Sequence, residues 1–367
     1  MLHTHLSGQI VFNGRFFGRR ITGVDRVAFE IIYAIDALLE SKNELVRGLR
    51  FAIFVPPDVT PDTVFLHIPF VNVGSHHGQL WEQWDLPLAL PQGTLLLNMC
   101  NSAPIWRARQ LVIIHDAATV RAPESYSCAF RAWYRVLIPI LFRFSRSICT
   151  VSNFSCRELR AVYGVRAEIA VLPEGVDHML RCDADTRVLE THALRNRPYV
   201  LAVSSLSPHK NFAAVIRAVE LIGDAWFDVV IAGGQNPRIF ARSDGRLPRH
   251  VKYIGYVTDP ELKALYANAA CFVFPSFYEG YGLPPTEAMA CGCPVVAAKA
   301  ASIPEVCGNA AMYFDPNDPA ELALILQKVM SDEVLRTKMR FDGKARAAEL
   351  RWSTTAVALL NEIHRVA

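Results

Sequence analysis

The residues best suited to chemistry lie in one segment of the chain, CFVFPSFYEGYGLPPTEAMACGCPVVAA, at positions 271–298. Two carboxylates, Glu279 and Glu287, stand eight positions apart and enclose Gly280 and Gly282. Glycines let the backbone approach a ligand closely, and the N-terminus of a following helix offers N–H groups to a phosphate. A carboxylate can accept hydrogen bonds from two adjacent sugar hydroxyls, so this turn predicts a nucleotide-sugar site. The alternative is that Glu287 only complements the helix dipole and that Glu279 is solvated.

A second candidate element is the segment YVLAVSSLSPHKNFAAVIRAVELI at 199–222. We expect a strand that ends near Ser204, a loop that carries His209 and Lys210, and then a helix. The ammonium of Lys210 and the helix N-terminus could act together on a diphosphate; a solvated loop lysine is the alternative. The sequence IAGG at 231–234 ends another predicted strand with two glycines, which alone is a weak sign of close backbone approach.

A basic loop, NGRFFGRRITGVDRVAFE at 13–30, precedes the first long predicted helix. Its arginines, Arg15, Arg19, Arg20 and Arg26, could contact a donor phosphate or an acceptor diphosphate, and a solvated basic loop is an equal alternative. The loop lacks the G-x-G-x-x-G pattern of dinucleotide sites, so we do not expect a nicotinamide cofactor.

The stretch YSCAFRAWYRVLIPILFRFSR at 126–146 mixes bulky apolar residues with arginines. Such a helix can lie on an anionic membrane surface, here anchored by Trp133 and Tyr134. We favour instead a crossover helix buried against a sheet and kinked at Pro139. The cluster at 75–78, Ser-His-His-Gly, has no carboxylate or cysteine at ligand spacing, so we expect a solvated loop and no metal.

Short β-branched runs alternate with amphipathic stretches along the whole chain, which predicts parallel sheets with helices on both faces. The predicted strands are 9–14, 50–56, 94–100, 110–116, 147–152, 168–173, 199–204, 227–232, 251–255, 271–275 and 294–298. The predicted helices are 23–40, 153–163, 211–222, 259–269, 285–291, 319–330 and 353–366. A polar stretch at 181–197 separates the two series. The fold class is therefore α/β, with two Rossmann-like domains and a cleft between them.

Composition narrows the class of protein. The chain has 367 residues, 51% of them hydrophobic. Its net charge of +3 lacks the strong positive charge that is typical of nucleic-acid-binding domains. Its nine cysteines lack zinc spacing, so we expect buried, reduced thiols and a cytosolic protein. We expect no signal peptide, and no run approaches 18 apolar residues.

The chain resembles the retaining glycosyltransferases of family GT4, which have the GT-B fold. The resemblance is carried by E-x7-E with AMACGCPVVAA and ASIPEVCGNAAMYFDP, and by LAVSSLSPHKNF, IAGG and YIGYVTDPELKALYANAACFVFPS in the same order. In the N-terminal half it rests on ITGVDRVAFEI, VIIHDAA and TVSNFSCREL. The resemblance implies an acceptor-binding domain at 1–180, a donor-binding domain at 198–350, and a helix at 351–367 that packs back on the first domain.

The resemblance also implies roles for single residues. Lys210 would contact the donor diphosphate, Glu287 the ribose hydroxyls, and Glu279 the transferred sugar near the reacting centre. His115 would lie near the transferred sugar and the acceptor. The remaining donor-side positions are Ser205, His209, Gly233, Gly234, Tyr256, Val257, Gly280, Tyr281, Gly282 and Leu283; the acceptor-side positions are Arg15, Gly23, Arg26 and Asp116. Many relatives carry arginine where this chain has His209, so neutralisation of the phosphates would depend more on Lys210.

The implied reaction is front-face transfer with retention, in which the leaving phosphate helps to deprotonate the acceptor hydroxyl and no metal is required. The expected donor is GDP-mannose, and the expected acceptor is a saccharide or a polyprenyl-diphosphate-linked oligosaccharide of cell-surface polysaccharide assembly. The protein would be cytoplasmic or peripheral on the inner membrane. The alternatives are a rhamnose, fucose, glucose or N-acetylglucosamine donor, a sugar-nucleotide epimerase of the same fold, and a non-catalytic binding protein.

Overall fold

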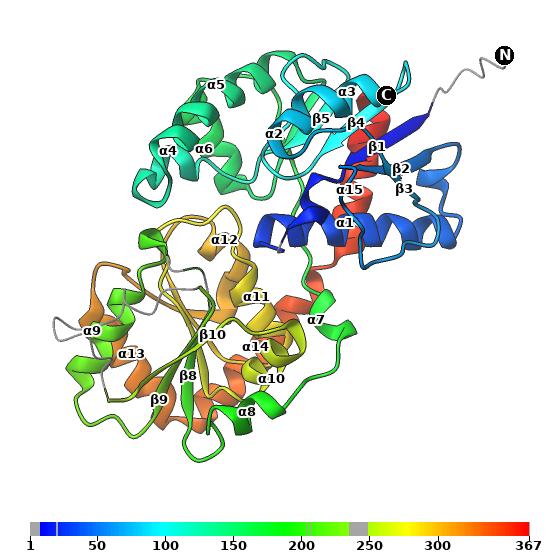
Figure 1. Ribbon diagram of the computed structural model, residues 1–367. Coiled ribbons are helices and arrows are strands. Elements are labelled where there is room, and N and C mark those ends of the chain that lie inside the picture. Colours follow the sequence, from blue (N-terminus) through cyan, green and yellow to red (C-terminus); the bar gives the residue numbers. More distant parts are fainter. Residues whose placement is uncertain (1–7, 20, 204, 206, 235–248, 367) are drawn as a thin grey trace. The chain divides into compact units, whose positions relative to one another are not determined.

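The computed structural model describes residues 8–19, 21–203, 205, 207–234 and 249–366. The chain divides into two compact units. Unit 1 comprises the residues up to Ala117, Ser127–Gly175 and the residues from Trp352 onward; unit 2 comprises Ala118–Tyr126 and Val176–Arg351. In Figure 1 unit 1 comprises the blue and cyan segments, the blue-green to green segment 127–175 and the red C-terminal helix, and unit 2 comprises the short segment 118–126 and the chain from green to orange.

Unit 1 is built on a seven-stranded sheet in the order β3-β2-β1-β4-β5-β6-β7, and all neighbouring strands are parallel. The strands are β1 Gln9–Asn13, β2 Arg50–Val55, β3 Phe70–Asn72, β4 Leu95–Asn98, β5 Gln110–Ile113, β6 Ser147–Thr150 and β7 Ala170–Val171. Because helices cover both faces of a parallel sheet, its central strands read as continuous apolar runs such as QIVFN and LLLN.

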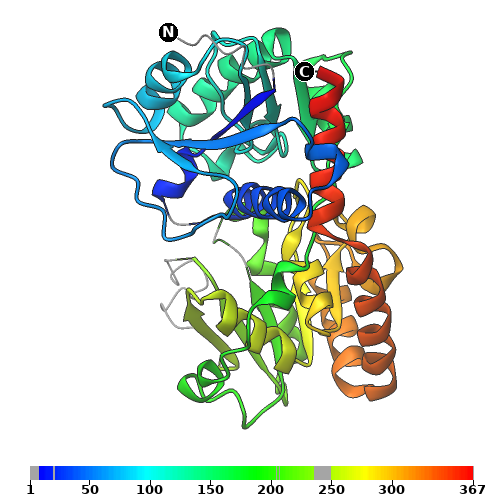
Figure 2. The same ribbon diagram turned by 90° about the vertical axis from the view of Figure 1, so that its right-hand side faces the viewer.

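The helices of unit 1 are α1 Gly23–Glu40, α2 Gly78–Leu80, the π-helical turn η3 Trp81–Asp85, α3 Leu86–Ala89, α5 Cys128–Phe144, α6 Asn153–Tyr163 and α15 Trp352–Val366, with short 3-10 turns η1 Arg15–Gly18 and η2 Glu44–Val46. A capping box between Thr22 and Asp25 begins α1. The last helix, α15, packs against α1 (Figure 2). The Oγ of Thr355 donates to the carbonyl of Pro173 at 2.5 Å, so α15 belongs to unit 1.

Helix α5 is a crossover helix that buries Tyr134, Leu137, Ile138 and Leu141. This agrees with the favoured interpretation of a helix packed against the sheet. Of the two residues of the alternative membrane anchor, Tyr134 is in the core and Trp133 packs partly buried against it. The large apolar side chains that α5 exposes are Phe130, Val136 and Phe144.

Unit 2 is built on a six-stranded parallel sheet in the order β10-β9-β8-β11-β12-β13. Its strands are β8 Tyr199–Val203, β9 Asp228–Ala232, β10 Val251–Gly255, β11 Cys271–Phe274, β12 Val295–Ala298 and β13 Ala311–Phe314. Its helices are α4 Ala118–Arg121, α7 His178–Arg181, α8 Arg187–Thr191, α9 Phe212–Ile222, α10 Asp259–Asn268, α11 Leu283–Ala290, α12 Ile303–Cys307, α13 Pro319–Ser331 and α14 Glu333–Glu349, with 3-10 turns η4 Pro123–Ser125, η5 Pro208–Lys210 and η7 Gly308–Ala310.

Both sheets reverse their winding once. In unit 1 the reversal lies between β1 and β4, and in unit 2 it lies between β8 and β11. At such a switch point the connections leave toward opposite faces, which opens a crevice outside the carboxyl ends of the two strands. These two edges are therefore the places where the fold can position a ligand.

The prediction of an α/β fold with two Rossmann-like halves is confirmed, with differences of detail. Strands β3 and β13 and helix α14 were not predicted, and the strand expected at 168–173 is reduced to Ala170–Val171. The polar stretch at 181–197 is not a bare linker, since α8 buries Val188 and Leu189 and belongs to unit 2. Ser204, the expected end of a strand, lies outside the described residues.

Candidate active site

The carboxyl ends of β8 and β11 bring together the two residues expected to meet the diphosphate and the sugar. Lys210 ends η5, which follows β8, and Glu279 lies in the loop that follows β11. The Nζ of Lys210 donates to both carboxylate oxygens of Glu279 at 2.8 Å. The side chains are 17% and 11% exposed, so the pair is sheltered but within reach of solvent. Charge-assisted hydrogen bonds of this kind are stronger than neutral ones.

Backbone contacts hold the two loops in place. The amide of Phe277 donates to the carbonyl of His209 at 2.9 Å, which joins the loop after β11 to the loop after β8. The Oγ of Ser302 donates to the carbonyls of Glu279 at 2.9 Å and of Tyr281 at 2.7 Å. The position of the ion pair is thus fixed from both sides by hydrogen bonds outside the pair itself.

Glu287 is buried in α11 and is not a solvated helix-dipole acid. Its Oε1 lies 3.0 Å from the Nε2 of His178, and its Oε2 accepts from the hydroxyl of Tyr266 at 3.3 Å. Burial raises the pKa of Tyr266 well above its ordinary value, and the charge of Glu287 adds to the effect, so Tyr266 stays a donor. The helix begins at Leu283 rather than 285, which makes Glu287 its fifth residue, beyond the first turn where a dipole interaction is strongest.

The glycine turn supplies fewer helical N–H donors than a helix N-terminus normally would. Gly282 precedes α11 with φ of 106°, a conformation that favours glycine. Pro284 and Pro285 occupy the next turn and carry no N–H. An anion at this helix end would therefore meet the amides of the turn itself and of Leu283, and the rest of its charge would depend on Lys210.

His209 does not supply a second positive charge. It is buried, and its Nδ1 lies 2.7 Å from the Oγ of Ser125. Burial lowers the pKa of His209, and the neighbouring ammonium of Lys210 lowers it further, so the neutral ring is favoured. This contact also explains why the segment 118–126 joins unit 2, although the expected boundary was at 180.

The other donor-side positions lie along the same edge of the unit 2 sheet. Gly233 and Gly234 follow β9 with positive φ; the amide of Gly233 donates to Gly255 at 2.6 Å, and the hydroxyl of Tyr253 donates to Gly234 at 2.8 Å. The remaining donor-side positions follow the ends of the neighbouring strands. Ser205 and Tyr256 are exposed, Val257 is half-buried, and Gly280, Tyr281 and Leu283 are buried. The parallel sheet therefore gathers every donor-side candidate except Glu287 at one edge, and Glu287 lies one helical turn further along.

His115 belongs to unit 1, in the loop after β5. Its Nε2 donates to the carbonyl of Met99 at 2.9 Å, and its Nδ1 lies 3.6 Å from Glu174. Burial by itself would lower the pKa of His115, but the Glu174 carboxylate, the Met99 carbonyl and the charge of Asp116 together raise it. Since a carbonyl can only accept, Nε2 must carry a proton, and both ring nitrogens are engaged.

The acceptor-side candidates are also in unit 1. Arg15 begins η1, and its Nε lies 3.3 Å from Oε1 of Glu82. Arg26 lies 3.8 Å from Glu30, one turn along α1. Gly23 is exposed at the start of α1, and Asp116 is half-buried next to His115. Arg20, another arginine of the expected basic loop, lies outside the described residues.

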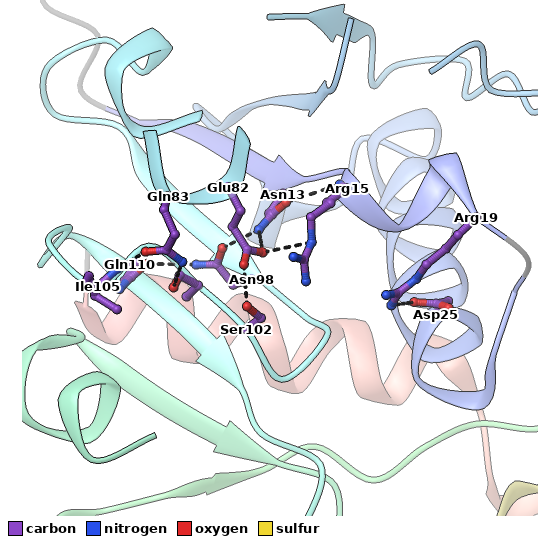
Figure 3. Close-up of polar contacts among 11 residues, drawn as sticks. Asn13, Arg15, Arg19, Asp25, Glu82, Gln83, Asn98, Ser102, Ile105 and Gln110 are labelled. Carbon is purple, nitrogen blue, oxygen red and sulfur yellow. Dashed lines mark hydrogen bonds and ion pairs between the residues drawn. The ribbon is translucent and has the colours of Figure 1, made fainter. Parts of the chain in front are cut away.

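Sequence reasoning missed a polar cluster at the switch point of unit 1 (Figure 3). Glu82 of η3 is buried and accepts hydrogen bonds from Asn13 at 2.8 Å and from the hydroxyl of Ser102. Asn98 connects Asn13 at 2.9 Å to Gln110 at 3.0 Å. Nothing local marks Glu82, whose partners lie up to 69 positions away. His178, the partner of Glu287, was missed for the same reason.

The part of the chain that the structure describes offers neither a metal site nor a membrane span. In that part of the chain no three His, Cys, Asp or Glu side chains are grouped so as to hold a metal ion. His76 and His77 each contact their own carboxylate, Asp85 at 2.9 Å and Asp58 at 2.8 Å. Of the helices in the described ranges, none combines the length and the apolar character needed to cross a bilayer.

Comparison with known proteins finds relatives for both units. Residues 189–346 match the family described as "Glycosyl transferases group 1". The chain is 29% identical over 264 residues to O-antigen chain mannosyltransferase B of Escherichia coli, covering 69% of each chain. It is 28% identical over 327 residues to O-antigen chain mannosyltransferase RfbU of Salmonella typhimurium, covering 84% of this chain and 87% of that one. Among solved structures, sucrose-phosphate synthase from Thermosynechococcus elongatus has the same fold, with a TM-score of 0.73, 16% identity and 98% of both chains covered.

Proposed function

We propose that this glycosyltransferase moves mannose from GDP-mannose, with retention, to a saccharide or polyprenyl-diphosphate-linked acceptor of cell-surface polysaccharide. The match of residues 189–346 to the glycosyl transferases group 1 family supports the transferase assignment. The mannose donor is supported by two relatives, 29% and 28% identical, that carry mannosyltransferase names. The single observation that carries the proposal is the Lys210–Glu279 pair at the switch point of unit 2, inside the matched segment.

The ion pair can exchange its partners when the donor binds. A diphosphate that approaches the turn would take the ammonium of Lys210 as its partner. The Glu279 carboxylate would then be released to accept hydrogen bonds from hydroxyls of the transferred sugar. Glu287, held by His178 and Tyr266, would accept from the ribose hydroxyls. Positioned donors aimed at developing charge are worth about 3–4 kcal/mol each in enzymes.

The reaction itself breaks the bond between the sugar C1 and the diphosphate oxygen and forms a bond from C1 to the acceptor oxygen. In the proposed front-face route the acceptor proton passes to the leaving phosphate. Lys210 would stabilise the negative charge that develops there, because His209 favours its neutral form. His115 is poorly placed as a base, since its Nε2 proton is donated to Met99, and its raised pKa favours an electrostatic role.

The outer face of α5 suits a peripheral contact with the cytoplasmic face of an anionic membrane. Arg135, Val136 and Arg143 are exposed along this face, and Phe144 is exposed at its end. The segment 126–146 contains no aspartate or glutamate. A basic face with apolar side chains can lie at a lipid surface, where a polyprenyl-linked acceptor would be held. We expect the protein to bind phosphatidylglycerol vesicles but not phosphatidylcholine vesicles. The double variant R135E/R143E should reduce this binding.

The donor assignment is tested by nucleotide binding and turnover of the full chain. A thermal-shift panel with GDP, UDP, TDP and ADP should show stabilisation by GDP, because a ligand at one hundred times its Kd stabilises the folded state by about 2.7 kcal/mol. GDP-mannose should then be consumed, with membrane extract as the source of acceptor. Stabilisation by UDP alone would overturn the mannose donor, and no turnover with any nucleotide sugar would overturn the transferase mechanism.

A further inference from the structure

The switch point of unit 1 holds a small pocket that the proposed donor chemistry does not use. It lies outside the carboxyl ends of β1 and β4, the position that open α/β sheets use for ligands. The pocket is lined by Asn13, Arg15, Phe16, Arg19, Glu82, Met99, Cys100 and Ser102. Figure 3 shows Arg15 and Glu82 directed toward each other, with Asn13 and Ser102 beside the carboxylate.

Both arginines of this pocket are already neutralised by buried acids. The Nε of Arg15 lies 3.3 Å from Glu82, and an Nη of Arg19 lies 2.5 Å from Asp25. The two carboxylate side chains are 2% and 0% exposed, so they cannot move away into solvent when a ligand arrives. The two arginines and the two carboxylates together have a net charge of zero. A diphosphate would therefore gain little net attraction here, whereas hydroxyl groups need only fixed donors and acceptors.

The polar groups are fixed by their own hydrogen bonds. Glu82 is held by Asn13 and Ser102, and Asn98 ties Asn13 to Gln110. Networks of this kind orient every member, at the expense of burying polar groups. Glu82 is presented by η3, a π-helical turn, and such turns are rare and are frequent at functional sites. Burial raises the pKa of Tyr134 to about 12, with Arg15 and Glu82 close enough to influence it, so its hydroxyl keeps its proton.

We propose that this pocket recognises one hydroxyl or hydroxymethyl group of a neutral sugar in the acceptor. Arg15 and Arg19 donate to the sugar oxygen, Glu82 accepts from its hydroxyl, and Phe16 forms an apolar wall. The pocket is small, so it takes the edge of a single sugar rather than a chain of them. This inference rests on the proposed function, and it replaces the expectation that the arginines meet a diphosphate.

The test compares acceptors that differ by one oxygen or by one charge. The probes are a neutral mannose disaccharide with a hydrophobic aglycone, its monodeoxy analogues, and the same disaccharide carrying a phosphate. With the full chain and GDP-mannose, we expect one deoxy analogue to lose at least tenfold in kcat/KM, because a site built to bond a hydroxyl rejects the analogue that lacks it. We expect the phosphate to change acceptor KM by less than threefold.

Variants then locate the effect in the pocket. R15Q and R19Q should raise the KM for the neutral disaccharide at least tenfold and abolish the discrimination between it and the deoxy analogue, while the KM for GDP-mannose stays within twofold. R47Q is the matched control, since Arg47 pairs with Glu44 on the exposed surface of the same unit at 2.5 Å. Arg19 is 47% exposed in its side chain, and Asp25 keeps its hydrogen bonds from the amide and hydroxyl of Thr22, so R19Q should fold.

Two outcomes overturn the inference. One is an acceptor KM that is unchanged in both arginine variants. The other is a phosphorylated disaccharide that binds the wild-type chain more than tenfold tighter than the neutral disaccharide and loses this advantage in R19Q. If the wild-type chain does not consume GDP-mannose, the proposed function fails separately. Saturation-transfer NMR with the neutral disaccharide then still decides the pocket, because binding lost in R19Q and kept in R47Q supports it, and binding kept in both overturns it.

Discussion

The two switch points use the same strand topology but hold their charges differently. In unit 2 one lysine faces one carboxylate in two loops, both partly exposed, and the second acid, Glu287, is bound by His178 and Tyr266. In unit 1 two arginines face two fully buried acids inside a network of amide side chains. A pair on loops can exchange partners when a charged ligand arrives, whereas a buried pair stays paired. The first arrangement suits a diphosphate and the second suits hydroxyl groups.

The largest effect should come from breaking the unit 2 pair. We expect K210A and E287A each to lower transfer by at least tenfold, because one removes the cation at the phosphates and the other removes the acceptor for the ribose. The measurement is kcat/KM for GDP-mannose. K338A is the control, since Lys338 pairs with Asp342 at an exposed helix surface. Activity like that of the wild type in both variants would refute the donor site.

The next prediction compares how much each switch point loses in stability when its carboxylate is neutralised. We expect E82Q to lower the free energy of unfolding by about 1–3 kcal/mol, because it leaves the half-buried guanidinium of Arg15 and the buried donors of Asn13 and Ser102 imperfectly paired. E279Q should lower it by less than about 1 kcal/mol, the range for pairs that solvent can reach. Urea unfolding of both variants measures the difference. Equal losses would mean that the two switch points are equally rigid.

Two of the buried histidines, His115 and His209, should respond to pH in opposite directions. His115 has a raised pKa when folded, so its contribution to stability is complete below the unfolded pKa of about 6.5 and is lost as pH rises through the folded pKa. His209 has a lowered pKa, so stability is lost as pH falls from about 6.5 through its folded pKa. Denaturant unfolding at a series of pH values should show H115Q removing the first slope and H209Q the second. A slope unchanged in its own variant would contradict that assignment.

The smallest effect concerns two glycines: Gly14, between the pocket residues Asn13 and Arg15, and Gly23, at the start of α1. G23A should change the free energy of unfolding by less than about 1 kcal/mol, because an added Cβ would meet nothing within 4 Å. G14A should be clearly destabilising, because its Cβ would lie 2.6 Å from Ile53 and 2.7 Å from the carbonyl of Phe54. Thermal unfolding distinguishes them. A stable G23A protein with altered acceptor KM would support a role for Gly23 at the acceptor.

The sequence predicted most of what lies close together along the chain. The strand–helix alternation predicted both sheets, and the loops after β8 and β11 predicted Lys210 and Glu279, because parallel strands end at one edge. The partners of buried groups could not be predicted in this way. His178 reaches Glu287 across 109 positions, and Asn13 reaches Glu82 across 69, so only the packed fold joins them. The start of α11 was placed too late because two consecutive prolines suggested a boundary that the structure sets at Leu283.

The division of the chain has a consequence for biogenesis. Unit 2 is nearly contiguous, whereas unit 1 needs α15, whose residues are translated after the whole of unit 2. A ribosome-bound chain can therefore close the later core while the earlier one still waits for the helix that packs on α1. During that interval the apolar face of α1 is exposed to chaperones and to other nascent chains, as transiently exposed apolar surfaces are in larger proteins.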